Sequence, residues 1–197
     1  MCYNNQLSEL NTSQNNNLIN LQCYSNQITE LNVSQNPLLK TFYCGANLLT
    51  ELDVSINTEL LYLGFVLNQI SEIDLTTNSN LINLNCHNNL LTQLDISNNT
   101  NINYLDCYNN SINCIKVWDI NYAEQSEILE NWNKDDFAIW SEDCSGCLDL
   151  NACNYTPLSY PEDNTLCIYA NQFYDCDGNC LNDLDFDLIC DEVDDCI

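Results

Sequence analysis

Residues 18–38 read LINLQCYSNQITELNVSQNPL and residues 39–59 read LKTFYCGANLLTELDVSINTE, so one pattern returns after 21 residues. Further copies begin at Leu60, Leu81 and Ile102, and residues 2–17 form a copy whose front is missing. The shared pattern is L-x-x-L-x-C-x-x-N-x-L-T-x-L-D-V-S-x-N. A fixed period of this length is typical of a solenoid built from stacked repeats.

Each unit contains two segments of similar pattern. The segment LQCYSN, residues 21–26, returns ten residues later as LNVSQN, residues 31–36. Alternate side chains of an extended segment share one face, so the aliphatic side chains and the cysteines are expected to point inward. We therefore predict two short strands in every coil, two parallel sheets, and almost no helix before residue 119.

Asparagines recur at two positions where the chain must bend between strands. At a bend the backbone leaves its ladder, and an Asn side chain can both donate to and accept from the freed groups. We expect these residues to be structural, because the leucine spacing is too regular for an Asn-rich low-complexity tract. The two columns are Asn5, Asn26, Asn47, Asn68, Asn89, Asn110 and Asn15, Asn36, Asn57, Asn78, Asn99.

On these repeats, residues 2–118 resemble the leucine-rich-repeat family, in particular the 21-residue Cys-containing repeats of secreted bacterial proteins from the Bacteroidetes group. The resemblance implies a mostly β, right-handed solenoid over residues 1–118, with partial first and last repeats. The family binds proteins, glycans and cell surfaces through variable outward positions. The resemblance therefore implies recognition and leaves the ligand open.

The fourteen cysteines fall into two groups. Five occupy one repeat position, whose counterpart in the third coil is Phe65, so they are expected to be buried free thiols that act as small hydrophobic residues. Zinc needs a tetrahedron of ligands, and a straight column supplies a line, which disfavours a metal. The five are Cys2, Cys23, Cys44, Cys86 and Cys107, and the other nine are Cys114, Cys144, Cys147, Cys153, Cys167, Cys176, Cys180, Cys190 and Cys196.

A stretch without the repeat, residues 119–145, follows the last coil. The final coil of a solenoid exposes the end of its core, so we expect this stretch to cover it, pinned by a Cys114–Cys144 disulfide. Similar caps follow the repeats in the resembled family. A thioredoxin-type reading of Cys144-Ser-Gly-Cys147 lacks the strand-then-helix context that such a motif needs.

The charge of the chain is strongly negative. Three lysines, Lys40, Lys116 and Lys134, stand against 29 acidic residues, which gives a net charge of −26. Nucleic acid and anionic membranes are therefore excluded as partners, and no apolar run is long enough for membrane insertion. Many cysteines indicate a secreted or cell-surface protein. Because the first residues already lie within a repeat, we expect a monomeric piece of a larger chain, with any export signal upstream.

Residues 146–197 form a Cys/Asp-rich segment that is too small for a hydrophobic core alone, so disulfides and metal are expected to hold an irregular module together. Its start, GCLDLNACNY, resembles the GC-x-D-x-x-ACNY repeats of large secreted proteins from the same bacterial group. Cys196 would open a second such unit.

Acidic residues near the end of the chain have the spacing of a calcium loop. They stand at positions 1, 3, 5, 9 and 12 of a twelve-residue segment, which resembles an EF-hand-like or thrombospondin type 3 loop. Oxygen ligands without His favour calcium. Leu188 departs from the Gly of that pattern, so a merely solvated loop is the alternative. A weaker site at Asp175, Asp177 and Asn179 is also considered. The ligands are Asp183, Asp185, Asp187, the Ile189 carbonyl, Asp191 and Asp194.

No catalytic residue is expected. His87 is the single histidine, and it directly follows Cys86, so in a strand the two side chains face opposite ways and cannot form a nucleophile pair. Repeated carboxylates such as Glu51 with Asp53 are expected to form an outward acidic stripe that serves solubility.

Tyrosines dominate the outward positions of the first predicted sheet. A tyrosine on a rigid sheet supplies contact area and a polar tip at small entropic cost, which suits binding of a protein or a glycan. We therefore predict a non-catalytic recognition or adhesion module, and a passive structural spacer of a larger cell-surface protein is the alternative. The predicted face comprises Tyr24, Tyr43, Tyr62, His87, Tyr104 and Tyr108.

Overall fold

The computed structural model describes residues 1–147, 149–155, 164–179 and 181. The chain divides into two compact units, Met1–Asp143 and Cys144–Ile197. Across the described residues, no helix is both long enough and apolar enough to cross a membrane.

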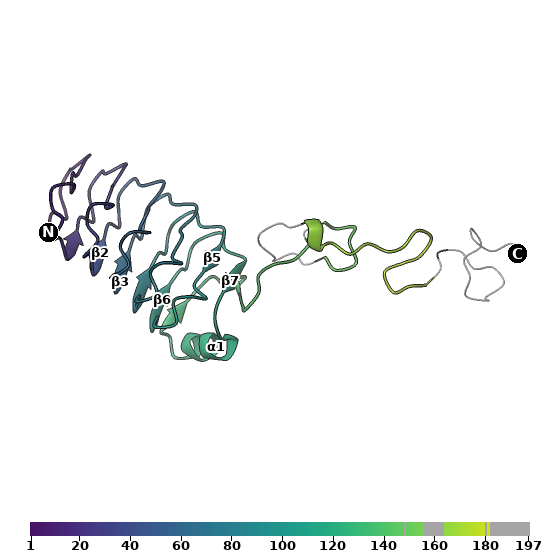
Figure 1. Cartoon of the computed structure of the whole chain (residues 1–197). Coiled ribbons are helices and arrows are strands. Elements are labelled where there is room, and N and C mark those ends of the chain that lie inside the picture. Colours follow the sequence, from purple (N-terminus) through teal and green to yellow (C-terminus); the bar gives the residue numbers. More distant parts are fainter. Residues whose placement is uncertain (148, 156–163, 180, 182–197) are drawn as a thin grey trace, which may run out of the picture. The chain divides into compact units, whose positions relative to one another are not determined.

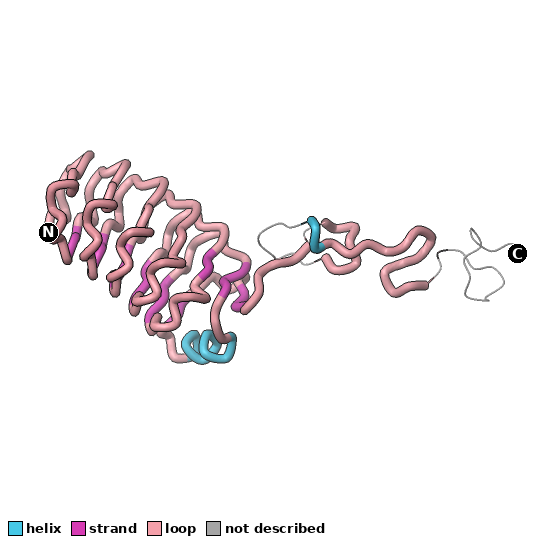
Figure 2. The backbone as a smooth tube through the Cα atoms, in the orientation of Figure 1, coloured by secondary structure: helices cyan, strands magenta, loops and turns pink. Residues whose placement is uncertain are grey.

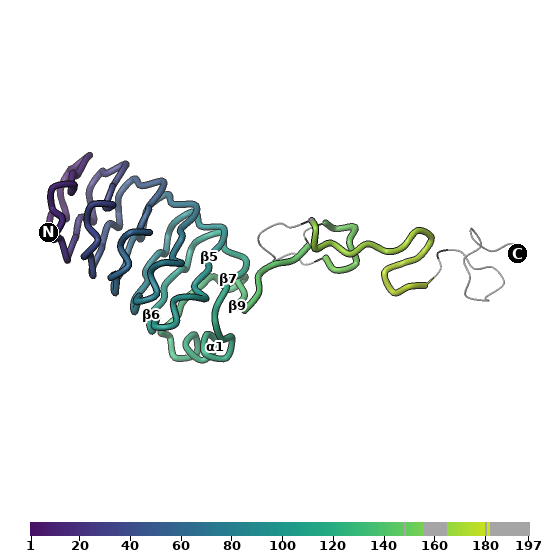
Figure 3. The backbone as a smooth tube through the Cα atoms, viewed as in Figure 1, coloured from purple at the N-terminus to yellow at the C-terminus, as the bar shows by residue number. Residues whose placement is uncertain are grey.

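The first unit is a mostly β solenoid whose coils stack in sequence order, as the colour gradient of Figure 3 shows. Each coil from residue 18 onward places one short strand in a common parallel sheet (Figure 1). The register advances by 21 residues per coil, so that Leu21 pairs with Phe42 and Leu84 with Leu105. The strands of this sheet are β1 (Asn20–Gln22), β2 (Thr41–Tyr43), β3 (Tyr62–Gly64), β4 (Asn83–Asn85), β6 (Tyr104–Asp106) and β8 (Trp132–Asn133).

A second parallel sheet has only three strands, β5 (Leu94–Asp95), β7 (Cys114–Lys116) and β9 (Ile139–Ser141). The prediction of two strands in every coil is therefore wrong for the earlier coils, where the corresponding segments carry no strand (Figure 2). The carbonyls there have other partners. The Val33 carbonyl, for example, accepts the backbone N–H of Asn36 at 3.0 Å and the side-chain amide of Asn57 at 3.2 Å.

The inward side chains of successive coils form one continuous core. Phe42, Phe65 and Leu63 are completely buried, and the predicted inward pair, Leu21 and Cys23, is 6% and 0% exposed. Because each coil buries its apolar side chains only against its neighbours, the stack and not the single coil is the stable unit.

Residues 119–143 cover the C-terminal end of this core. Helix α1 (Ile120–Ile128) begins after Asp119, whose side chain accepts the Tyr122 N–H at 3.1 Å and caps the helix. Trp132 of β8 pairs with Leu105 of β6 and is 1% exposed. Its ring packs edge-on against Trp118 and Tyr122, with centroids 5.5 and 5.6 Å away. No helix precedes residue 119, as predicted.

One carboxylate of the cap replaces the coil that would follow. Within the stack, the N–H of Asn88 donates to the Tyr108 carbonyl of the next coil at 3.0 Å. In the last coil, the N–H groups of Asn109 and Asn110 donate instead to the two carboxylate oxygens of Asp135, each at 3.0 Å. Asp135 therefore completes hydrogen bonds that no further coil supplies.

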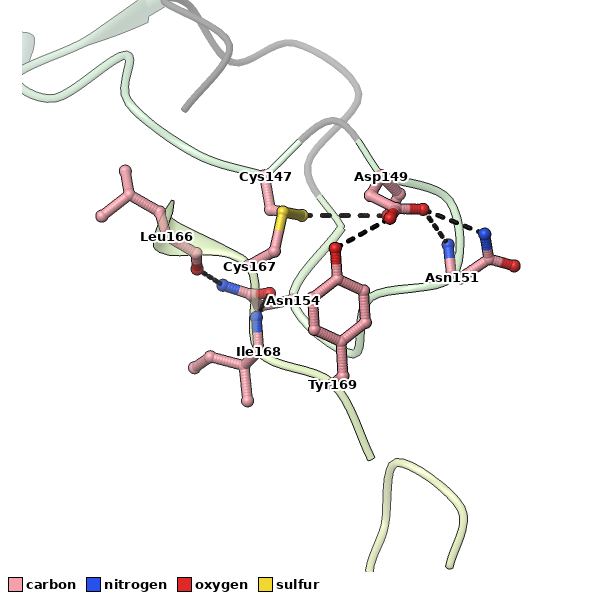
Figure 4. The surroundings of a disulfide bond; sticks show 8 residues. All are labelled: Cys147, Asp149, Asn151, Asn154, Leu166, Cys167, Ile168 and Tyr169. Atoms are coloured by element: carbon pink, nitrogen blue, oxygen red, sulfur yellow. Dashed lines mark hydrogen bonds between the residues drawn. A yellow bond between two sulfur atoms is a disulfide. The ribbon is translucent and has the colours of Figure 1, made fainter. Parts of the chain in front are cut away.

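The second unit is irregular in the residues described. Besides the 3-10 turn η1 (Asn164–Leu166), it contains disulfides Cys147–Cys167 and Cys153–Cys176, with Cα–Cα separations of 4.9 and 5.1 Å. Figure 4 shows the first of these among its neighbours.

Candidate recognition face

Two columns of outward side chains run across the first sheet. The central residue of each strand from β1 to β4 and of β6 is buried, so the first and third residues of each strand point outward. We call this surface the tyrosine–amide face. Its columns are Asn20, Thr41, Tyr62, Asn83, Tyr104 and Gln22, Tyr43, Gly64, Asn85, Asp106.

Three of the predicted tyrosines lie on this face. Tyr62 and Tyr104 are 39% and 37% exposed in the first column, and Tyr43 is half-buried in the second. Burial raises the pKa of the Tyr43 phenol, and the nearby Tyr62 raises it further. The Tyr43 phenol therefore stays neutral at physiological pH.

The other predicted residues lie just beyond the strands. Tyr24, His87 and Tyr108 share one repeat position, two residues after the ends of β1, β4 and β6. Tyr3, at the same repeat position, stacks on Tyr24 with ring centroids 4.5 Å apart, and the sequence prediction missed it. His87 contacts the side-chain amide of Asn88, while the Cys86 side chain is fully buried. The two side chains thus have opposite surroundings, as their adjacency in sequence predicts.

Gly64 allows the Tyr43 ring to lie against β3. A Cβ atom at position 64 would lie 2.7 Å from Cδ1 of Tyr43 and 3.1 Å from its Cε1. Any other residue would displace the ring, so Gly64 fixes the orientation of Tyr43. Sequence reasoning missed this residue, although a glycine in an otherwise polar outward column was a visible signal.

The amide side chains of the face are unpaired. Among the described residues, Asn20, Gln22, Asn83 and Asn85 make no side-chain hydrogen bond, and Oδ1 of Asn85 is buried without a donor. An amide offers two donor hydrogens and an acceptor oxygen, so the face carries unused hydrogen-bonding capacity.

Asparagines at the bends behave in the opposite way. Oδ1 of Asn47 accepts the Ile28 N–H at 3.0 Å, and its Nδ2 donates to the carbonyls of Cys23 and Cys44 at 3.1 and 2.9 Å. In the second column, Asn57 donates to the Val33 and Asn36 carbonyls. The structural role predicted for both columns is therefore confirmed.

The cysteine column is buried and free. Cys23, Cys44, Cys86 and Cys107 are at most 1% exposed, Cys2 is partly buried, and none of the five is in a disulfide. Burial, followed by the nearby Cys2, raises the pKa of the Cys23 thiol to about 12. Such thiols are inert toward nucleophilic chemistry.

The side of the early coils that lacks a strand ladder carries an acidic groove of about 760 Å³, with Glu30, Glu51, Glu72, Asp53 and Asp74 among its lining. Its aspartates have local partners. Asp74 accepts both the hydroxyl and the N–H of Thr76, at 2.6 and 2.9 Å, and these bonds lower its carboxyl pKa. They close a turn in each coil, which supports a structural role.

Two of the carboxylates described in the second unit likewise accept hydrogen bonds from protein donors. Asp149 accepts the Tyr169 hydroxyl at 2.8 Å and the Asn151 N–H at 2.9 Å, as Figure 4 shows. Asp175 accepts the N–H and the side-chain amide of Asn179 at 2.8 and 3.0 Å.

No group of three or more His, Cys, Asp or Glu side chains that could hold a metal occurs in the part of the chain that the structure describes. The candidate site at Asp175, Asp177 and Asn179 has only two such side chains and stays a prediction. The predicted calcium loop, residues 183–194, lies outside the described residues. Cys114 and Cys144 are each disulfide-bonded. Their pairing with one another stays a prediction.

Comparison with known proteins identifies the type of solenoid. No protein-family model matches the chain, and no curated protein matches it. A leucine-rich-repeat protein of Leptospira interrogans matches at 26% identity over 68% of this chain and 35% of its own, with a TM-score of 0.55. The functional domain of InlJ from Listeria monocytogenes, described as including a cysteine ladder, matches at 32% identity over 59% of this chain and 33% of its own, with a TM-score of 0.45.

The chain thus spans about a third of the length of each of these proteins. Its fold matches that of leucine-rich-repeat proteins.

Proposed function

We propose that the chain is a non-catalytic extracellular recognition module that binds a protein or a glycan through the tyrosine–amide face. The observation that carries this proposal is the contrast between two sets of amides. Those of the bend column that contains Asn47 use both donor and acceptor inside the solenoid, whereas those on the face use neither. Exposed, unpaired polar groups beside tyrosine rings suit a ligand.

The scaffold holds this face rigid. Strands β1 to β4 and β6 pair with one another in a fixed register, and the side-chain amide of Asn47 and its counterparts in other coils fix the bend that follows each strand. Side chains that are already ordered lose little entropy on binding, so even modest contacts contribute to affinity.

An extracellular setting is supported by the disulfides of the second unit. For the same unit we retain the proposal that Asp183, Asp185, Asp187, Ile189, Asp191 and Asp194 bind calcium. Calorimetric titration of the oxidised full chain should then show heat on calcium addition, and no heat would reject the site.

The test of the recognition function is a triple substitution, Tyr43→Ala/Tyr62→Ala/Tyr104→Ala. The wild-type chain should be retained on an array of glycans or on a panel of purified extracellular proteins, and the triple variant should lose at least tenfold in affinity. A matched control, Leu48→Ala/Ile56→Ala/Leu90→Ala, removes exposed apolar side chains elsewhere and should bind as the wild type does.

Thermal unfolding of both variants should stay close to that of the wild type, because all six side chains are at least partly exposed. No retention of the wild type, or equal retention of the triple variant, would overturn the proposal and favour the passive spacer.

A further inference from the structure

We infer that the tyrosine–amide face takes an extended, electrically neutral glycan, an inference that rests on the recognition function proposed above. Its centre is β4, where Asn83 and Asn85 stand between Tyr62 on β3 and Tyr104 on β6.

The spacing of the rings suits a chain of sugars. Tyr62, Asn83 and Tyr104 occupy one register position on three successive strands. Neighbouring strands lie about 4.8 Å apart, so the two tyrosines stand roughly 9.6 Å apart along the solenoid, a length that a disaccharide spans. The C–H faces of sugar rings pack against aromatic faces, which carry partial negative charge. Two tyrosines can thus contact alternate units of one glycan chain, with Asn83 between them.

The amides match hydroxyl groups. A hydroxyl both donates and accepts, and so does an amide side chain, which allows paired hydrogen bonds with vicinal hydroxyls. Among the described residues, Asn83 makes no side-chain hydrogen bond and is partly exposed. Its amide can therefore pair with a ligand hydroxyl without first breaking a hydrogen bond inside the protein.

The charge of the face selects against ionic ligands. No lysine or arginine occupies either column, and Lys116 and Lys134 are paired with Asp95 and Glu127. Lys40 directly precedes β2 and places one cation next to the face. Asp106 is the one charged residue in the columns, and it accepts the side-chain amide of Asn133 at 3.2 Å. With a net charge of −26 behind it, the face repels sulfated, phosphorylated or sialylated glycans.

The face also lacks what a protein partner uses most. The centres of protein interfaces are enriched in Trp, Tyr, Phe, Met and Arg, and of these only Tyr occurs in the two columns. No aliphatic side chain stands there either. Rings and amides with no cationic and a single anionic side chain among them therefore favour a neutral glycan over a protein surface.

The experiment measures binding of the oxidised full chain to defined oligosaccharides. The probes are linear neutral hexasaccharides of glucose, mannose, xylose and N-acetylglucosamine, their sulfated counterparts, and sialylated glycans. At least one neutral probe should bind, its affinity should change by less than about twofold between low and high salt, and the charged probes should be excluded.

Two substitutions at Tyr62 distinguish a contact with the aromatic ring from a merely apolar contact, and a third, at Asn83, tests the amide. Tyr62→Phe keeps the ring and should stay within about twofold of the wild type, whereas Tyr62→Leu keeps apolar area and should lose about tenfold. Asn83→Ala should also lose about tenfold. Asn121→Ala, which removes an exposed amide from α1, is the matched control and should bind normally.

The possible results distinguish a failure of the glycan inference from a failure of the proposed recognition function. Binding only to charged glycans, or only to a protein through Tyr43, Tyr62 and Tyr104, would overturn the glycan inference and leave the recognition function standing. Equal binding by Tyr62→Leu and Tyr62→Phe would also overturn it. A neutral glycan that binds the triple tyrosine variant as well as the wild type would overturn both.

Discussion

The two units of the chain use cysteine in opposite ways. In the solenoid, the cysteines of the repeat column are free and buried among aliphatic side chains. In the second unit, Cys147, Cys144 and Ala152 are the only buried residues among those described, and the cysteines form crosslinks. Stacked coils supply each other with a core, which makes a thiol merely a small apolar group. A segment that lacks a core needs covalent bonds.

Reduction of the disulfides should therefore unfold the second unit and leave the solenoid folded. This is the largest effect that we expect. With dithiothreitol, the second unit should lose its ordered structure, because Cys147–Cys167 and Cys153–Cys176 join segments that share almost no buried apolar area. Limited proteolysis with mass spectrometry should then find cleavage after residue 143 and protection before it. Cleavage within the coils at the same protease dose would contradict this division.

Removal of a bend amide should be the next largest effect. Asn47→Ala leaves the Ile28 N–H and the Cys23 and Cys44 carbonyls without their side-chain partner, and we expect a loss of about 4 kcal/mol in unfolding free energy. Asn57→Ala, whose Oδ1 has no donor in the native state, should cost about half as much. Urea unfolding followed by circular dichroism measures both, and equal costs would show that the unpaired oxygen has no influence.

A polar substitution in the cysteine column should lower the unfolding free energy by a smaller amount. Cys44→Ser places a hydroxyl in a fully buried position and should cost about 2 kcal/mol. Cys44→Ala, which removes only apolar volume, should cost about 1 kcal/mol. In the native protein, Cys44 should react with a thiol reagent only at the rate of unfolding, because burial raises its pKa well above the usual value. Fast labelling of the folded chain would count against a sealed core.

The smallest effect concerns the turn aspartates. Hydrogen bonds from Thr76 hold the Asp74 pKa below its usual value, so this carboxylate stabilises the fold above the ordinary Asp pKa and loses that contribution as pH falls through the folded one. Asn32 makes the same turn bond to Ser34 without a charge, at 2.9 Å. Asp74→Asn should therefore have a slightly lower Tm than the wild type at pH 7 and lose less Tm between pH 7 and acid. An equal loss would mean that this bond contributes nothing measurable.

Much of the solenoid follows directly from the sequence. The 21-residue period fixes the register, and a position that holds either Cys or Phe65 must be inward, which the structure confirms. The absence of a second strand from the early coils could not be predicted, because the sequence pattern around Val33 and Val54 is compatible with a strand. Whether a ladder forms depends on the carbonyl partners, and the amides of Asn57 and Asn78 reach those carbonyls from the next coil.

The outward tyrosines of the tyrosine–amide face could be predicted from the sequence, but the contacts of its side chains could not. Alternation places Tyr43, Tyr62 and Tyr104 outward, but the contact of Tyr43 with Gly64 depends on a rotamer that the sequence does not specify. The same holds for the unpaired Asn85 amide. Disulfide pairings such as Cys153–Cys176 were also beyond prediction, because spacing alone leaves many connectivities open.

The hydrogen bonds of Asp135 bear on how a stack of 21-residue coils can change in length. Its two oxygens stand in for the carbonyls of an absent neighbour, and the N–H groups it meets recur in every coil. Insertion or deletion of a whole 21-residue unit upstream would present the same pair of donors to the same carboxylate. The cap is therefore independent of the number of units before it, so the tyrosine–amide face can gain or lose strands without any change to the cap.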